Sequence, residues 1–197
     1  MPSPRRLVLA STSTYRRALL ERLGSPFECA DPGSDETVLA SEAPADTALR
    51  LAAAKASAVA PRFPDALIIG SDQVASCGSE QLSKPGNHEN AVRQLTMVSG
   101  RTVSFDTAVV VLDSKSGRQG VRVVACRVRF RPLSAEQIEI YLRREKPYDC
   151  AGSAKAEGLG IALIARMETD DPTSLIGLPL IALTELLADA GFPVLAR

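Results

Sequence analysis

The sequence predicts an α/β fold in which helices flank a mixed β-sheet, with a central hairpin that can build a second lobe. Three observations predict it: short apolar runs alternate with helical patterns at both ends, two long β-branched runs lie between them, and 45% of the 197 residues are hydrophobic. That composition is enough to bury a core. The length suits one domain, so we expect residues 1–197 to form a single domain of two lobes.

The first third of the chain shows clear starts and stops of secondary structure. Ser11-Thr12-Ser13 supplies cap residues for a first helix, Asp46 can cap a second, and Pro61 ends that second helix. The predicted elements are a strand at 6–10, a helix at 15–23, a polar loop at 31–44, an Ala-rich helix at 47–60 and a strand at 66–70.

The remainder predicts a hairpin followed by helices. Asn87 caps one helix, Ser116-Gly117 marks the hairpin turn, and Ser134 with Gln137 forms a capping box. The predicted elements are a turn-rich stretch at 78–87, a helix at 87–98, strands at 101–113 and 121–131, a helix at 134–144, a glycine-rich loop at 150–160, a strand at 160–165 and a helix at 179–190.

Charge and hydropathy exclude several protein classes. The 23 basic and 23 acidic residues cancel, so we expect neither a nucleic-acid polymer nor a membrane surface as partner. The N-terminal apolar run at 7–10 is too short for a signal peptide, and no run approaches a membrane span. A cytoplasmic protein is expected.

Histidine and cysteine usage limits the chemistry. His88 is the only histidine, which excludes a multi-histidine zinc site, and it is expected on the surface of a helix. The four cysteines form no C-x-x-C pair, so we expect reduced, buried thiols.

The first candidate site lies where a strand passes into a helix. Hydroxyls and free backbone N–H groups of Ser11-Thr12-Ser13 point to one spot there, and Arg16 and Arg17 follow in the first helical turn. A bound phosphate would explain two cations at the positive end of a helix dipole. A plain helix cap with a solvated basic face explains the pattern equally well.

Carboxylates supply the second candidate site. Asp72 follows the predicted strand at 66–70, where open α/β sheets place ligands, and Asp35-Glu36 could supply a partner from the polar loop. Paired carboxylates suit Mg²⁺, which also takes substrate phosphates and waters. Alone, Asp72 could equally be a turn residue, and Asp35-Glu36 reads more simply as a solvated loop.

Two lysines and a glutamate complete the candidates. Lys55 interrupts an Ala-rich helix and Lys84 precedes Pro85 on a loop, so both could hold phosphates or could be ordinary surface lysines. Glu157 stands beside Gly158 in the glycine-rich loop, where small residues allow a flat ligand to approach closely. A structural loop with a solvent-facing glutamate is the alternative.

Together these stretches resemble the Maf family of nucleoside triphosphate pyrophosphatases, which was first named for septum formation. The resemblance runs from about residue 5 to 190, in order and at familiar spacing. It rests on Leu9-Ala10-Ser11-Thr12-Ser13, Arg16-Arg17, Asp35-Glu36, Lys55, Ile69-Gly70-Ser71-Asp72-Gln73, Lys84-Pro85, Ser99-Gly100, Cys150-Ala151-Gly152-Ser153, Glu157-Gly158 and Gly177-Leu178-Pro179-Leu180.

The resemblance implies a two-lobed fold similar to the inosine triphosphate pyrophosphatases, with the active site in a cleft between the lobes. It also implies cleavage of a nucleoside triphosphate to the monophosphate and pyrophosphate with a divalent cation, Mg²⁺ or Mn²⁺. Asp72 is the expected general base or metal ligand, with Glu36 as a second ligand. The expected phosphate-binding residues are Ser11, Ser13, Arg16, Arg17, Lys55 and Lys84.

Within the family, the chain resembles the branch that acts on 7-methyl-GTP at two positions: Gln73, which follows Asp72, and Glu157. The branch that acts on dTTP and UTP typically carries threonine and glutamine at those places. Tyr15 stands where the 7-methyl-GTP branch often has tryptophan and keeps an aromatic face, and Ser83 replaces a more usual glycine. Tyr15, Gln73 and Glu157 are therefore the expected specificity residues. Two alternatives stay open: a dTTP/UTP pyrophosphatase and a non-enzymatic regulator of cell division. A homodimer is also left open.

Overall fold

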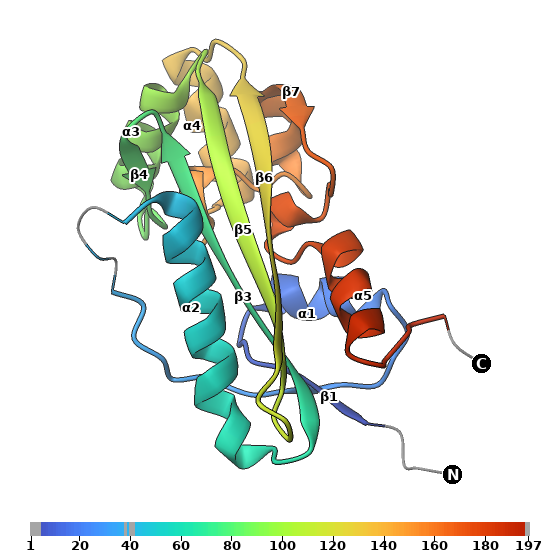
Figure 1. Ribbon diagram of the computed structural model, residues 1–197. Helices are drawn as coiled ribbons and strands as arrows, with labels where there is room; N and C mark the ends of the chain where they lie inside the picture. The colour runs from blue at the N-terminus through green and yellow to red at the C-terminus, as the bar shows by residue number, and fades with distance from the viewer. Residues whose placement is uncertain (1–4, 38, 40–41, 196–197) are drawn as a thin grey trace. The chain divides into compact units, whose positions relative to one another are not determined.

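A computed structural model describes residues 5–37, 39 and 42–195 and confirms the mixed α/β class (Figure 1). Seven strands form one sheet in the order β2-β1-β3-β5-β6-β7, with β4 paired to β3. The strands are β1 (Arg6–Leu9), β2 (Glu28–Cys29), β3 (Ala66–Cys77), β4 (Glu80–Leu82), β5 (Thr102–Asp113), β6 (Gln119–Phe130) and β7 (Ile164–Glu168). The α-helices are α1 (Thr14–Glu21), α2 (Pro44–Val59), α3 (His88–Val98), α4 (Ala135–Glu145) and α5 (Leu180–Asp189).

Four short 3₁₀ helices complete the described secondary structure: η1 (Ala60–Arg62), η2 (Ala151–Ser153), η3 (Leu159–Leu163) and η4 (Ser174–Ile176). Within the described part of the chain, none of the helices has the length and apolar character needed to cross a membrane.

The chain folds as two compact units. Unit 1 contains the chain up to Gln73, Thr107–Val124 and the chain from Asp171 onward, and unit 2 contains Val74–Asp106 and Ala125–Asp170. The central hairpin thus contributes to both units, as the predicted second lobe requires. The predicted cleft between the lobes and the single-domain assignment stay predictions.

Unit 1 is built on the parallel pair β1 and β3, which are in register from Arg6↔Ala66 to Leu9↔Ile69. Alternate residues of a strand face opposite sides, so odd and even positions of β3 meet different helices. The odd positions Leu67 and Ile69 join an apolar cluster with Leu20 of α1 and Leu183 of α5. The even position Gly70 meets α2, which runs alongside β3 (Figure 1).

Gly70 sets how closely α2 approaches the sheet. A Cβ at this position would lie 2.1 Å from the carbonyl oxygen of Ala52 and 3.0 Å from the Cβ of Ala56. The obstacle is helix backbone, which cannot rotate away. A glycine is therefore required for α2 to lie this near β3.

Gly70→Ala is expected to lower the free energy of unfolding by about 1–3 kcal/mol, the usual cost of overpacking a tight core, or more if α2 must shift as a body. Denaturation in urea measures this. Gly120→Ala in β6 is the matched control, because its Cβ would meet the flexible Cδ2 end of Leu186 at 2.9 Å rather than backbone. An equal loss in both variants would contradict the explanation.

Unit 2 combines the far end of β3 with β4, β7 and helices α3 and α4. β3 and β4 are antiparallel, with Ala75 opposite Leu82, and β6 and β7 are antiparallel, with Arg127 opposite Glu168. Asn87 accepts a hydrogen bond from Asn90 N at the start of α3. Ser134 and Gln137 form the predicted capping box of α4.

Several predicted boundaries are wrong, each for a local reason. The predicted strand at 66–70 continues to Cys77, since β3 pairs with β5 as well as with β1, and β4 pairs with its last residues, 75–77. The helix predicted from Asp46 begins at Pro44, whose ring favours the first helical position. The strand predicted at 160–165 is 3₁₀ helix up to Leu163 and strand from Ile164. Strand β4 lies in the stretch predicted as turn-rich, and strand β2 lies in a stretch for which no element was predicted.

The histidine and cysteine predictions hold only in part. His88 begins α3 as expected, but it is half-buried and its ring nitrogens lie 3.0 Å from Tyr148 Oη and Glu139 Oε1. All four cysteines are free thiols. Cys77 and Cys126 are buried as predicted, whereas Cys150 is half-buried and Cys29, on the short strand β2, is exposed.

Candidate functional site

The centre of the candidate site in unit 1 is a buried lysine between two carboxylates. Lys55 is only 5% exposed, and its Nζ lies 2.6 Å from Asp72 Oδ1 and 2.6 Å from Glu36 Oε1. The Asp72 side chain is 12% exposed and that of Glu36 is 60% exposed. One cation therefore pairs with both a sheltered carboxylate from β3 and an open one from the loop after β2.

The alternation of β3 explains why Asp72 meets Lys55. Asp72 is two residues after Gly70 and therefore faces the same side, toward α2. Gly70 contacts Ala52 and Ala56 of α2, and Lys55 stands between those two residues. The sequence predicted Asp72 after the end of a strand, whereas it lies inside β3, three residues beyond the last pairing with β1 at Ile69.

The predicted cap between β1 and α1 is confirmed. Ser13 accepts a hydrogen bond from Arg16 N at 3.4 Å, and Ser11, which is buried, accepts one from Ser13 N at 3.1 Å. Ala10 N donates to Ile69 O at 2.8 Å, so the chain leaves the sheet beside β3 and turns directly into this cap. The cap is therefore fixed next to the strand that carries Asp72.

Arg16 belongs to the same electrostatic environment as the Lys55 cluster. Burial lowers the pKa of Arg16, and the carboxylates of Asp72 and Glu36 oppose that shift. Its Nε donates to the carbonyl oxygen of Gly177 at 2.8 Å. Gly177 has φ 111°, in the region that favours glycine, and a Cβ there would lie 3.6 Å from Arg16 Nε.

Gln73 lies on the opposite face of β3 from Asp72 and supports the turn that ends at Gly177. Its Nε2 donates to Ser174 O at 2.8 Å, Leu175 O at 3.1 Å and Thr107 Oγ1 at 2.9 Å. Ser71 Oγ, on the same face, lies 2.9 Å from Gly177 O. The turn at 174–177 is thus attached to β3, and through Gly177 it orients Arg16.

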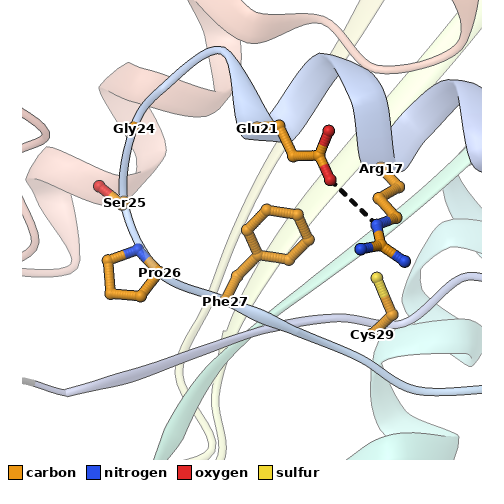
Figure 2. Close-up of a pocket in the computed structure, with 7 residues that line it drawn as sticks. All are labelled: Arg17, Glu21, Gly24, Ser25, Pro26, Phe27 and Cys29. Carbon is orange, nitrogen blue, oxygen red and sulfur yellow. Dashed lines mark hydrogen bonds and ion pairs between the residues drawn. The ribbon is translucent and has the colours of Figure 1, made fainter.

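Arg17 is not brought to the Lys55 cluster. Its side chain is 64% exposed, and its Nε pairs with Glu21 Oε1 at 3.0 Å. Figure 2 shows this pair among the residues that line a pocket, which are Arg17, Glu21, Gly24, Ser25, Pro26, Phe27 and Cys29. The phosphate-binding role of Arg17 stays a prediction.

The remaining candidates lie in three places. Tyr15 is half-buried in the first turn of α1, in unit 1. Lys84 is exposed after β4 and Glu157 is exposed in the glycine-rich loop, both in unit 2. The roles predicted for these three residues stay predictions.

Comparison with known proteins decides the family. Residues 6–190 match the family described as Maf-like protein. The chain belongs to this family. A protein of Cupriavidus pinatubonensis named 7-methyl-GTP pyrophosphatase is 55% identical over 99% of this Maf chain and 98% of its own. A protein of Thiobacillus denitrificans with the same name is 58% identical over 96% of this chain and 94% of its own.

Among solved structures, the Staphylococcus aureus Ham1 protein matches this Maf chain with a TM-score of 0.45 and 12% identity, over 64% of this chain and 72% of its own.

Asp72 and Glu36 are the pair of carboxylates that the predicted divalent cation would use, and that role stays a prediction. Both carboxylates already contact one positive charge, the Lys55 ammonium, at 2.6 Å. No cluster of three His, Cys, Asp or Glu side chains suited to a metal occurs among residues 5–37, 39 and 42–195. Two carboxylates suffice for Mg²⁺ where substrate phosphates and waters supply the other ligands.

Sequence reasoning missed the support around Arg16. Ser71 and Gly177 stood inside motifs that carried the resemblance, but nothing in their spacing showed that the two residues meet. Asp171 was also missed: it is 2% exposed, and its Oδ2 accepts from Ile181 N at 2.7 Å at the start of α5. A carboxylate at a helix N-terminus is a cap, so Asp171 stabilises α5.

Proposed function

We propose that this protein hydrolyses 7-methyl-GTP to 7-methyl-GMP and pyrophosphate. The observation that carries the proposal is the buried Lys55 ammonium held between Asp72 and Glu36 at 2.6 Å. A sheltered carboxylate beside buried cations suits proton abstraction next to a phosphate chain. Membership of the Maf family and the names of relatives at 55–58% identity support the same activity.

In the proposed reaction, water attacks the α-phosphorus while Asp72 accepts the proton that the water loses. The bond from the α-phosphorus to the bridging oxygen breaks, and pyrophosphate leaves with the electron pair of that bond. General base catalysis contributes roughly 10²–10⁴-fold. A second effect comes from Lys55 and Arg16, whose positive charges stabilise the charge that develops on the phosphate oxygens.

We assign the triphosphate to the strand–helix turn and its cations. Ser11, Ser13 and nearby backbone N–H groups supply donors, Arg16 and Lys55 supply charge from unit 1, and Arg17 and Lys84 complete the proposed set. Asp72 and Glu36 would hold Mg²⁺ or Mn²⁺, which supplies positive charge to the phosphate oxygens when bound.

Base selectivity is assigned to Glu157, Tyr15 and Gln73. Methylation at N7 places positive charge on guanine, which makes N1–H and the exocyclic amine better donors for the Glu157 carboxylate. The same charge strengthens stacking on the aromatic face of Tyr15, by about 0.5–2 kcal/mol. Because Gln73 Nε2 is already used by the turn at 174–177, its part in selectivity is proposed to run through its Oε1 or through that turn.

A nucleotide panel tests the proposal directly. Purified protein with Mg²⁺ or Mn²⁺ should release pyrophosphate faster from 7-methyl-GTP than from GTP, UTP or dTTP. Faster release from UTP and dTTP would favour the other Maf branch. The absence of pyrophosphate release from all four would favour a non-enzymatic role in cell division. A homodimer and a cytoplasmic location stay predictions.

Glu157→Gln is expected to lower kcat/KM for 7-methyl-GTP by about 10–150-fold, because a charge-assisted hydrogen bond of about 1.5–3 kcal/mol is lost. It should also relax the bias against UTP, since an unpaired carboxylate no longer faces the pyrimidine carbonyls. Glu80→Gln, an exposed glutamate of β4, is the matched control and should behave as wild type. Equal losses on 7-methyl-GTP and UTP would remove Glu157 from base recognition.

A further inference from the structure

The loop that carries Glu157 is held on both sides by α4. Lys155 N donates to Tyr141 Oη at 3.0 Å, and Leu159 N donates to Glu145 Oε2 at 2.6 Å. Glu157 lies midway between the two anchored amides. All of these residues belong to unit 2, so the arrangement is internal to one compact body.

Two glycines of this loop lie too close to neighbouring atoms to carry a side chain without a shift. A Cβ on Gly158 would stand 2.8 Å from both carboxylate oxygens of Glu145. A Cβ on Gly160 would stand 2.5 Å from Lys155 O, so the loop also closes on itself. A side chain at Gly158 would displace the Glu145 carboxylate, and one at Gly160 would collide with the backbone of the loop.

The two anchors are chemically suited to hold backbone amides. The Glu145 side chain is 15% exposed and also pairs with Lys155 Nζ through Oε1 at 3.3 Å. Hydrogen bonding to Glu145 raises the pKa of Lys155, so the lysine keeps its charge. Tyr141 is 3% exposed, and burial raises the pKa of its phenol, so the oxygen accepts from Lys155 N as a neutral hydroxyl.

We propose that Glu145 and Tyr141 are positioning residues for base recognition, which fix the 155–160 loop so that the Glu157 carboxylate is presented to the base in one orientation. The proposal rests on the proposed function of Glu157. Neither anchor needs to touch the nucleotide. A recognition group on a loop is only as selective as the loop is fixed, so loss of an anchor should reduce selectivity before it reduces turnover.

Substitutions on α4 test this with kinetics. Glu145→Ala should lower the ratio of kcat/KM for 7-methyl-GTP to kcat/KM for GTP by about 10-fold, through KM for 7-methyl-GTP, with kcat unchanged. Glu145→Gln keeps an oxygen acceptor for Leu159 N and should recover part of the ratio. Tyr141→Phe should lower the ratio as well. Glu139→Gln is the matched control, because it lies on the same helix but pairs with His88 and Arg143.

A double variant of Glu145 and Glu157 distinguishes positioning of the Glu157 carboxylate from a general effect of Glu145 on protein stability. When Glu157→Gln has already removed the carboxylate, Glu145→Ala should change the ratio by less than about twofold, since two residues in one chain of contacts are not additive. A second full 10-fold loss in the double variant would overturn the proposal. So would a Glu145→Ala variant that lowers kcat for both nucleotides equally.

Amide hydrogen exchange of the nucleotide-free protein gives a readout independent of catalysis. Glu145→Ala should accelerate exchange at the Leu159 amide and Tyr141→Phe at the Lys155 amide, whereas the amides of α3 stay as in wild type. If the wild type does not distinguish 7-methyl-GTP from GTP, the proposed function fails. Amide hydrogen exchange then remains as the test of whether the two α4 side chains fix the 155–160 loop. Faster exchange at these two amides would then support the positioning, and unchanged exchange would overturn it.

Discussion

Asp72→Asn is expected to lower kcat for 7-methyl-GTP by at least about 100-fold, the contribution of a general base. Asparagine keeps the shape of the side chain and an oxygen that can accept from Lys55 Nζ, which lies 2.6 Å from Asp72 Oδ1. It cannot accept the proton that the attacking water loses. The loss should appear with every nucleotide, because the chemistry at the α-phosphorus is shared.

Steady-state pyrophosphate release measures the effect, and circular dichroism checks that the variant is folded. Asp65→Asn is the matched control: it stands just before β3 and makes only an exposed pair with Lys115 at 3.3 Å. Its turnover should equal that of the wild type. If Asp72→Asn retains turnover within a few-fold of wild type, another group must take the proton.

Lys55→Met should have the largest effect on stability, lowering the free energy of unfolding by about 3–5 kcal/mol, as expected when a buried ion pair loses one partner. The methionine keeps most of the apolar stem, so the loss reports the missing charge. Asp72 would stay sheltered, with its side chain 12% exposed, and without the ammonium that neutralises it. Denaturation in urea measures the change.

Added Mg²⁺ or Mn²⁺ should recover part of the lost stability in Lys55→Met and raise that of the wild type less. In the variant Lys55 no longer competes for Asp72 and Glu36, and a ligand that binds only the folded protein stabilises it. Lys115→Met is the control, since its pair with Asp65 is 69% and 61% exposed and contributes little. A variant that responds to metal no more than wild type would remove Asp72 and Glu36 from the proposed metal site.

The parts of the fold that follow from short-range signals could be predicted from the sequence. Ser13 and the Ser134–Gln137 box begin their helices where expected, because a cap is decided by residues three or four positions apart. The hairpin turn at Gly117, with φ 74°, is equally local. These signals placed α1, α4 and the paired strands β5 and β6 without knowledge of the tertiary structure.

What could not be predicted depends on partners distant in the sequence. β3 extends past Gly70 because β5 and β4 pair with it, and the residues of β4 carry weak strand preference of their own. The use of Gln73 by the turn at 174–177 joins positions about a hundred residues apart. Lys55, Asp72 and Glu36 were each named as candidates, but their meeting at 2.6 Å and the contact of Gly177 with Arg16 needed coordinates.

Consecutive residues of β3 send Asp72 to one face and Gln73 to the other. A shift of one residue in the pairing of this strand would exchange the two faces. One inserted or deleted codon here would therefore turn the proposed general base to the wrong face and release the turn at 174–177 together. The loop that brings Glu36 can change length at little entropic cost. During divergence, we expect this protein to tolerate length variation around Glu36 and none between Ile69 and Gln73.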